Sequence, residues 1–212
     1  MKQLSIIKLT NPLEVNDYLS ASLLLNDIAW NNIDQVAWPD QYPYKPEAKF
    51  QIAYTDHNII IHFDVQEEFV KAQFIRPNEN VWEDSCVEFF LSLDNKETYY
   101  NFEFNALGTG LIGYGPSIKT ERSRLAEDQI LTVDSLIQVK TIKGKKSWQQ
   151  ILIIPIELFG ITSNELPGKL AHANFYKCGD GLPNPHFISW NLIENPTPNF
   201  HLPQYFGEIR FE

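Results

Sequence analysis

The sequence is poor in cysteine, methionine and basic charge, and each scarcity excludes a class of protein. Two cysteines in 212 residues, Cys86 and Cys178, cannot build the disulfide framework of a small secreted domain, so we expect buried free thiols. Met1 is the only methionine, which removes methionine as an internal haem ligand. With 27 acidic and 17 basic residues, the net charge of −10 argues against nucleic acid and anionic membranes as partners.

Long hydrophobic runs are also missing. No stretch approaches the ~20 apolar residues of a membrane-spanning helix. The start, MKQLSIIKLT, has its apolar run interrupted by Lys8 and followed by Asn11-Pro12, which makes a poor signal peptide. We therefore expect a cytoplasmic protein for the chain as it stands, or a secreted or periplasmic one if the N-terminus is trimmed. The oligomeric state cannot be predicted.

Aromatic residues and prolines are plentiful, and together they favour a β fold. Aromatics make up 13% of the chain, and 13 prolines separate short segments of alternating apolar and polar residues. Roughly ten such segments predict an all-β, antiparallel β-sandwich of jelly-roll type. We expect a single domain over residues 1–212. Its first 44 residues should supply a helix over Leu13–Leu25, covering one end of the sandwich, and an ordered aromatic loop.

The most informative segment is VWEDSCVEFFL, from Val81 to Leu91. Read as a strand, it places Val87 and Phe89 on one face and Cys86, Glu88 and Phe90 on the other. A carboxylate in mid-strand needs a wet, paired or ligand-bound surrounding. Glu88 therefore indicates a functional face.

The next segment predicts a second acid beside the first. LDNKET is typical of a turn, and YYNFEFN returns as a strand that places Glu103 opposite Glu88 if the turn centres on Asn95-Lys96. Directly opposed like charges destabilise an antiparallel pair. Compensation could come from Arg122 or Arg124, from a bound cation, or from water and sugar hydroxyls in an open cleft.

Three kinds of chemistry remain open for these residues. Paired carboxylates, Asp84 with Glu88 or Glu88 with Glu103, could be glycosidase machinery, although acids on a polar sheet face more often accept hydrogen bonds. The histidines and Cys178 lack the spacing of a zinc motif, and we expect no cofactor. A structural Ca²⁺ is weakly indicated by three side chains of the turn, Asp94, Asn95 and Glu97.

Two aromatic residues stand at strand ends, where loops would expose them. Trp82 precedes one strand, and Phe200 lies in a proline-bounded loop before the last strand. Flat apolar rings beside carboxylates and amides suit a sugar, although each ring could equally plug the end of a sandwich.

The segments VWEDSCVEFF, YNFEFNALGTG and ANFYKCGDGLPNPHFISWNLIENPTPNFHLPQYFGEIRF resemble carbohydrate-binding modules of family 9 and their bacterial relatives, over roughly Lys45 to Glu212. The resemblance implies a β-sandwich that clamps a sugar between two aromatic rings. Trp82 and Phe200 match the clamp positions, Glu88 a sugar-contacting acid and Asn105 a sugar-contacting amide.

The chain departs from the family at two of these positions. Phe200 stands where the best-known modules carry tryptophan, and Glu103 where such modules can carry arginine. Family modules are usually appended to secreted xylanases, which suggests xylan or another polysaccharide as a ligand.

The resemblance and the residues together predict non-catalytic binding of a mono- or oligosaccharide. The predicted binding residues are Trp82, Glu88, Glu103, Asn105, Arg122, Tyr176, Lys177 and Phe200. The alternatives are a glycan-acting enzyme that uses Glu88 and Glu103, and a structural or interaction domain that has lost its sugar.

Overall fold

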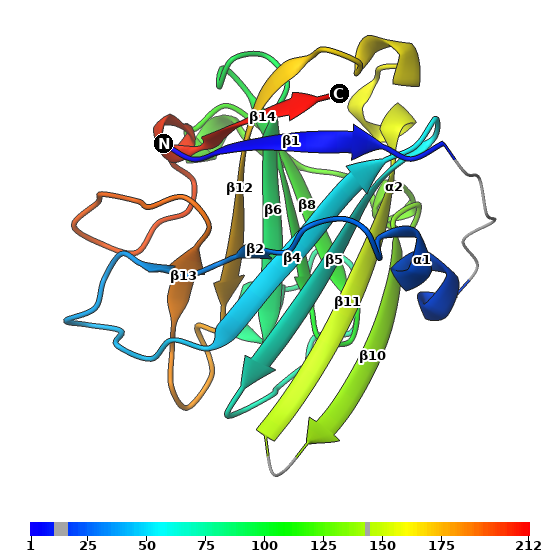
Figure 1. The fold of residues 1–212 in the computed structure, drawn as a ribbon. Helices are drawn as coiled ribbons and strands as arrows, with labels where there is room; N and C mark the ends of the chain where they lie inside the picture. Colours follow the sequence, from blue (N-terminus) through cyan, green and yellow to red (C-terminus); the bar gives the residue numbers. More distant parts are fainter. Residues whose placement is uncertain (11–16, 143–144) are drawn as a thin grey trace.

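The computed structural model describes residues 1–10, 17–142 and 145–212, and its architecture is mainly β (Figure 1). Over these residues fourteen strands form one mixed sheet. The longer strands are β1 (Gln3–Lys8), β4 (Glu47–Tyr54), β5 (Asn58–Glu67), β6 (Cys86–Ser92), β7 (Tyr99–Asn105), β8 (Gly110–Gly115), β10 (Asp134–Ile142), β11 (Lys145–Pro155), β12 (Leu170–Cys178) and β14 (Gly207–Phe211). The short elements are β2 (Asn31–Asn32), β3 (Gln35–Val36), β9 (Ser123–Arg124), β13 (Phe187–Ser189) and the helices α1 (Tyr18–Leu24) and α2 (Glu127–Ile130).

The sheet curls as a half-barrel, so that its two limbs pack face to face (Figure 1). We call β10-β11-β5-β4 the helix limb and β14-β12-β6-β7-β8-β9 the cavity limb. Strand β1 joins them, because it pairs in parallel with β14 from Gln3 to Ile6 and with β4 at Ile7 and Lys8. These parallel pairs correct the purely antiparallel sheet that was expected. The jelly-roll connectivity stays a prediction.

The core lies between the two limbs and follows the predicted alternation. Phe50 of β4 stacks on Phe175 of β12, with ring centroids 3.6 Å apart. Phe89 of β6 also stacks on Phe175, with ring centroids 5.0 Å apart. All three rings are fully buried. Because burying a phenylalanine contributes about 1.5–3 kcal/mol, these contacts hold the limbs together. The opposite face of β6 and β12 is left for a second apolar cluster that includes Phe90 and Tyr176.

A two-residue turn sets the register of β6 and β7. Asn95 and Lys96 both have positive φ, 60° and 74°, which is the backbone of a tight hairpin turn. The Asp94 carboxylate accepts hydrogen bonds from Thr98 N (3.0 Å) and Ser92 Oγ (2.8 Å) and closes the turn. The predicted turn centre is therefore confirmed, and with it the pairing of Glu88 with Glu103.

Helix α1 packs differently from the prediction. The predicted start of the helix falls on residues 11–16, which lie outside the described residues. Leu19 and Leu23 are 67% and 60% exposed, whereas Ala21 and Leu25 are buried. They join an apolar cluster with Ala53, Ile60, Ile151 and Ile153. The helix thus covers the outer face of the helix limb (Figure 1) rather than one end of the sheet.

The aromatic loop after α1 is ordered, as expected. Trp38 is 6% exposed and donates its indole N–H to the carbonyl of Asn195 at 2.7 Å. This bond ties the loop to the segment that precedes Phe200. No helix in the described ranges is long and apolar enough to cross a membrane.

Candidate functional site

A cavity of about 690 Å³ opens on the outer face of the cavity limb. Its floor comes from β6, β7, β8 and β12, and its walls from η1 (Val81–Glu83) and the segment 197–201. Five of the eight predicted binding residues line it, namely Trp82, Glu88, Glu103, Arg122 and Phe200. Side chains from segments more than a hundred residues apart therefore meet in one hollow.

The two acids of the floor are buried side by side. Glu88 and Glu103 are register partners in β6 and β7 and are only 3% and 5% exposed. Burial raises the pKa of Glu103 to about 7 and that of Glu88 well above its usual range. Burial therefore favours the protonated form of both carboxyls, which lowers the repulsion between them.

The expected counter-charge acts on Glu103 through an amide. Within the described residues, no lysine or arginine forms an ion pair with Glu88 or Glu103. Arg122 donates instead to Asn101 Oδ1, and Asn101 Nδ2 donates to Glu103 Oε1 at 2.9 Å.

Three further contacts of Arg122 and a glycine beside Asn101 fix this relay in place. Arg122 also donates to the carbonyls of Gly115 (2.6 Å) and Pro116 (2.9 Å), and its guanidinium lies 3.8 Å from the ring centroid of Tyr99. Gly113 is the register partner of Asn101, and a Cβ there would approach Asn101 Oδ1 to 2.5 Å. Glycine at this position therefore leaves room for the relay.

The two aromatic residues occupy different surroundings. Trp82 is partly exposed, and the Arg124 guanidinium lies 5.7 Å from its ring centroid. Phe200 is 8% exposed and stacks on Tyr176, with centroids 4.1 Å apart and planes at 9°. The structure records no ring contact between Trp82 and Phe200. Trp82 thus presents the more accessible ring to the cavity.

Tyr176, one of the predicted binding residues, does not line the cavity. It is fully buried beneath Phe200, and its hydroxyl donates to the Phe200 carbonyl at 3.2 Å. These contacts fix the position of Phe200, so Tyr176 affects the cavity indirectly, through the placement of that ring.

Lys177 also lies outside the cavity, because β12 turns its side chain to the inner face. Its ammonium forms a fully buried ion pair with Glu67 at 3.0 Å and approaches His186 Nε2 at 2.8 Å. Glu67 in turn accepts from the Trp148 indole at 2.7 Å. The Lys177 ammonium is therefore held by buried partners on the inner face and cannot contact a ligand in the cavity.

Asn105 is the third predicted residue that does not line the cavity. Its amide donates to Asp84 Oδ2 and to the Phe74 carbonyl, both at 2.9 Å. Its carbonyl oxygen accepts from Leu107 N (3.1 Å) and Thr109 N (3.0 Å). All four hydrogen-bonding positions are used, so Asn105 organises the loop after β7. Asp84, suggested as a catalytic partner of Glu88, is fully buried in the same network.

Sequence reasoning missed several residues of the cavity. Asn101 shares a strand face with Glu103, which was the available signal for it. Asp180 and Asn199 lie in loops without periodicity, and nothing in the local sequence indicated that they line the cavity. Asp180 is held there by a backbone hydrogen bond to the Trp82 carbonyl at 3.1 Å.

Both cysteines are buried free thiols, as expected. Cys178 lines the cavity and donates to Glu88 Oε1 at 3.0 Å, and Cys86 lies directly opposite Cys178 in the β6–β12 ladder. Burial raises the pKa of Cys86 to about 11 and that of Cys178 well above its usual range. Neither thiol is an activated nucleophile in this environment.

In the turn suggested for Ca²⁺, the Asp94 carboxylate accepts hydrogen bonds from residues of the turn itself. Asp94 is occupied by Ser92 and Thr98, as described above. Calcium binding by Asp94, Asn95 and Glu97 stays a prediction that this arrangement does not favour.

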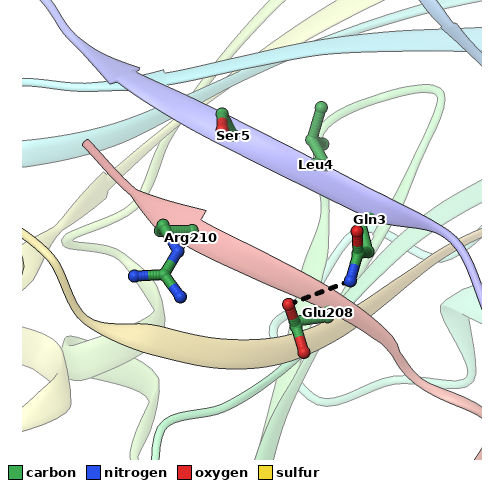
Figure 2. Close-up of a pocket in the computed structure, with 5 residues that line it drawn as sticks. All are labelled: Gln3, Leu4, Ser5, Glu208 and Arg210. Carbon is green, nitrogen blue, oxygen red and sulfur yellow. Dashed lines mark hydrogen bonds between the residues drawn. The ribbon is translucent and has the colours of Figure 1, made fainter.

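A second, smaller hollow of about 200 Å³ is lined by residues of the paired strands β1 and β14 (Figure 2). Its lining is Gln3, Leu4, Ser5, Glu208 and Arg210, and Gln3 donates to Glu208 at 3.2 Å. It contains none of the predicted binding residues and no aromatic ring. The larger cavity is therefore the better candidate site.

Comparisons with known proteins place the chain in a family. The model of carbohydrate-binding family 9 matches residues 17–211. A crystal structure of a Bacteroides uniformis protein, to which carbohydrate binding has been provisionally assigned, is 37% identical with a TM-score of 0.90, and the alignment covers 100% of this chain and 99% of that one. No curated protein matches the chain significantly.

Two solved structures of a family 9 module from Caldicellulosiruptor kristjanssonii share the fold. The complex with glucose has a TM-score of 0.63, and the complex with cellotriose 0.60. Both are 16% identical to this chain and are covered over 96% and 94% of their lengths, with 100% of this chain aligned.

Proposed function

Because the chain belongs to carbohydrate-binding family 9, we propose that it binds a mono- or oligosaccharide, without catalysis, in the cavity lined by Trp82, Glu88, Glu103 and Phe200. One observation carries this proposal. An accessible tryptophan and a buried acid pair, predicted as ligand contacts from sequence, line the same cavity of about 690 Å³. That volume lies within the range of small-molecule sites.

Trp82 is the proposed platform for the apolar face of a sugar ring. Trp82 and Phe187 both line the cavity and are partly exposed, and Trp82 has the larger ring. Phe200 also lines the cavity, and its stacking on the buried Tyr176 ring restricts its position. In this proposal the two rings are not equivalent. Trp82 stacks on the sugar ring, whereas the less exposed Phe200 borders the binding site.

The polar floor supplies the hydrogen bonds to sugar hydroxyls. Glu88 and Glu103 can accept from hydroxyl groups when ionised and can donate when protonated. Arg122 is occupied by backbone carbonyls and by Asn101, so we assign it the orientation of Glu103 rather than a direct contact.

Gluco-configured sugars are the first ligands to test. The family modules from C. kristjanssonii were solved with glucose and cellotriose, and this chain has the same fold. Xylo-oligosaccharides are the second choice, from the sequence resemblance. We expect weak binding, since a sugar buries little apolar area and ordering costs offset much of the gain.

The test is calorimetric titration of the reduced protein with glucose, cello-oligosaccharides and xylo-oligosaccharides in a buffer that contains a chelator. Trp82→Ala should reduce affinity by about tenfold or more, because aromatic contacts dominate such sites. Trp30→Ala is the matched control, since Trp30 is a 38% exposed tryptophan outside the cavity. No heat with any of these sugars, or equal loss in both variants, would refute the proposal.

A hydrolysis assay on the same protein tests the alternative that the chain is a glycan-acting enzyme. The opposed Glu88 and Glu103, with raised pKa values, are the only observation in its favour. Release of product from aryl glycosides or oligosaccharides, lost in Glu88→Gln, would replace the binding proposal with a hydrolytic one.

A further inference from the structure

Three potential metal ligands converge at the floor of the cavity. Cys86 and Glu88 are two residues apart in β6, so their side chains project from the same face. Cys178 lies directly opposite Cys86 in β12. The two sulfur atoms and a Glu88 carboxylate oxygen all lie within 4.8 Å of one another, and within the described residues this is the one such group of three.

We propose that Cys86, Cys178 and Glu88 form a binding site for a thiophilic divalent cation, of which Zn²⁺ fits the donor set best. Two thiolates select soft or borderline metals over Ca²⁺ and Mg²⁺, which prefer oxygen ligands alone. A carboxylate is an accepted third ligand of zinc. The site does not depend on sugar binding, although it shares the floor of the same cavity.

The spacing of the donors is close to that of a tetrahedral site. Zinc–sulfur bonds of about 2.3 Å place two sulfur ligands about 3.8 Å apart. The observed limit of 4.8 Å therefore requires shifts of about an ångström, which side-chain rotation supplies. Cys178 Sγ and Glu88 Oε1 are 3.0 Å apart, which is shorter than the roughly 3.6 Å between a sulfur and an oxygen ligand of tetrahedral zinc, so these two groups must move apart by about half an ångström.

The surroundings leave this position for a cation. Lys177, the adjacent basic residue, projects to the opposite face of β12 and is paired with Glu67. Within the described part of the chain no basic side chain forms an ion pair with Glu88. A cation bound to two thiolates and a carboxylate would carry a net charge of −1, and Arg122 and Arg124 line the same cavity.

A metal ion could enter from the cavity and keep one coordination position open to it. Cys178 and Glu88 line the cavity, whereas Cys86 lies fully buried behind them. Three protein ligands with a fourth position for water or another oxygen is a familiar zinc arrangement. The geometry therefore gives the ion both an entry path and a fourth ligand.

The experiment titrates the reduced, metal-free protein with Zn²⁺ and, as a spectroscopic probe, with Cd²⁺ and Co²⁺, in the absence of sugar. We expect one equivalent per chain, a rise in Tm, and a thiolate-to-metal charge-transfer band. X-ray absorption on the wild-type zinc complex should report two sulfur ligands together with oxygen. This reading does not require any variant to fold.

Variants then assign the ligands. Cys86→Ser and Cys178→Ser should each remove about half of the charge-transfer intensity, because one of the two thiolates is lost. Glu88→Gln should weaken binding by about tenfold or more, since even outer-shell partners of metal ligands contribute that much. Glu103→Gln is the matched control, because it is an equally buried acid of the same cavity that is not a member of the group. It should bind zinc like the wild type.

Three results would overturn the proposal. These are no binding by the reduced protein, binding whose X-ray absorption shows no sulfur ligand, or a Glu103→Gln effect as large as that of Glu88→Gln. The sugar titration, performed with a chelator present, is decided separately, so failure of one proposal leaves the other standing.

Discussion

Glu88 and Glu103 lie directly opposite each other in β6 and β7, and the positive charge nearest to this pair by hydrogen bonding, Arg122, reaches Glu103 only through Asn101. Two facing acids are thus accommodated in the sheet by protonation, which burial favours, and by an amide relay instead of an ion pair. The arrangement predicts how stability depends on pH.

We expect Glu103 to destabilise the fold as pH rises. Its pKa is raised from an ordinary value of 4.5 to about 7, because burial disfavours the carboxylate. The unfolded chain releases this proton first, so the contribution of Glu103 is complete below pH 4.5 and is lost as pH rises through 7. Glu103→Gln should remove roughly 2 to 3 kcal/mol of pH dependence across this window. Urea unfolding of metal-free protein between pH 4 and 8 measures it, and parallel curves for variant and wild type would contradict it.

His62 should produce the opposite slope in acid. Burial lowers its pKa to about 4, so the folded protein keeps it neutral while the unfolded chain gains a proton below about 6.5. Stability is therefore lost as pH falls from 6.5 toward 4, by about 2 to 3 kcal/mol. His62→Gln should unfold at a Tm that changes less over this interval. His57→Gln, an exposed histidine in the β4–β5 turn, serves as the control and should leave the slope unchanged.

Lys177→Met should be among the most damaging single changes. It leaves the Glu67 carboxylate buried without its cation, and breaking a buried pair in this way costs about 3–5 kcal/mol. The double variant Glu67→Gln with Lys177→Met should recover much of this loss. Denaturant unfolding of the two variants checks the expectation. A Lys177→Met protein as stable as the wild type would contradict this structural role of the ion pair between Lys177 and Glu67.

Tyr176→Phe separates the positioning of Phe200 from direct sugar contact. The variant keeps the stacked ring but loses the hydrogen bond to the Phe200 carbonyl, at a cost of about 1 kcal/mol. We expect a several-fold loss of sugar affinity with a nearly unchanged fold. Tyr54→Phe, which loses a hydroxyl bond to the Glu212 carbonyl far from the cavity, is the control. An equal affinity loss in both variants would mean that Tyr176 has no specific effect on the site.

The parts of the fold that could be predicted are those set by neighbouring residues. Period-2 alternation and the turn at Asn95-Lys96 were enough for the β6–β7 hairpin and for the facing pair Glu88 and Glu103. Strand β1 was missed because only Ile6 of its residues is buried, and its partners are supplied by both limbs.

The site residues divide in the same way. Trp82 and Phe200 were found from their position at strand ends and from the family resemblance. Asn105 and Lys177 could not be judged, because the groups that occupy them, Asp84 and Glu67, come from other strands and loops. Whether a polar side chain is free for a ligand depends on such distant partners, which a single sequence does not reveal.

The parallel pairing of β1 with β14 has a consequence for folding. Gln3 and Glu208 are 205 residues apart in the chain yet hydrogen-bonded to each other. Contacts of such sequence separation slow folding, because the loop between them must be ordered first. During synthesis, β1 leaves the ribosome long before β14 is made. Until then its outer edge is an unpaired strand edge, open to mispairing with another nascent chain.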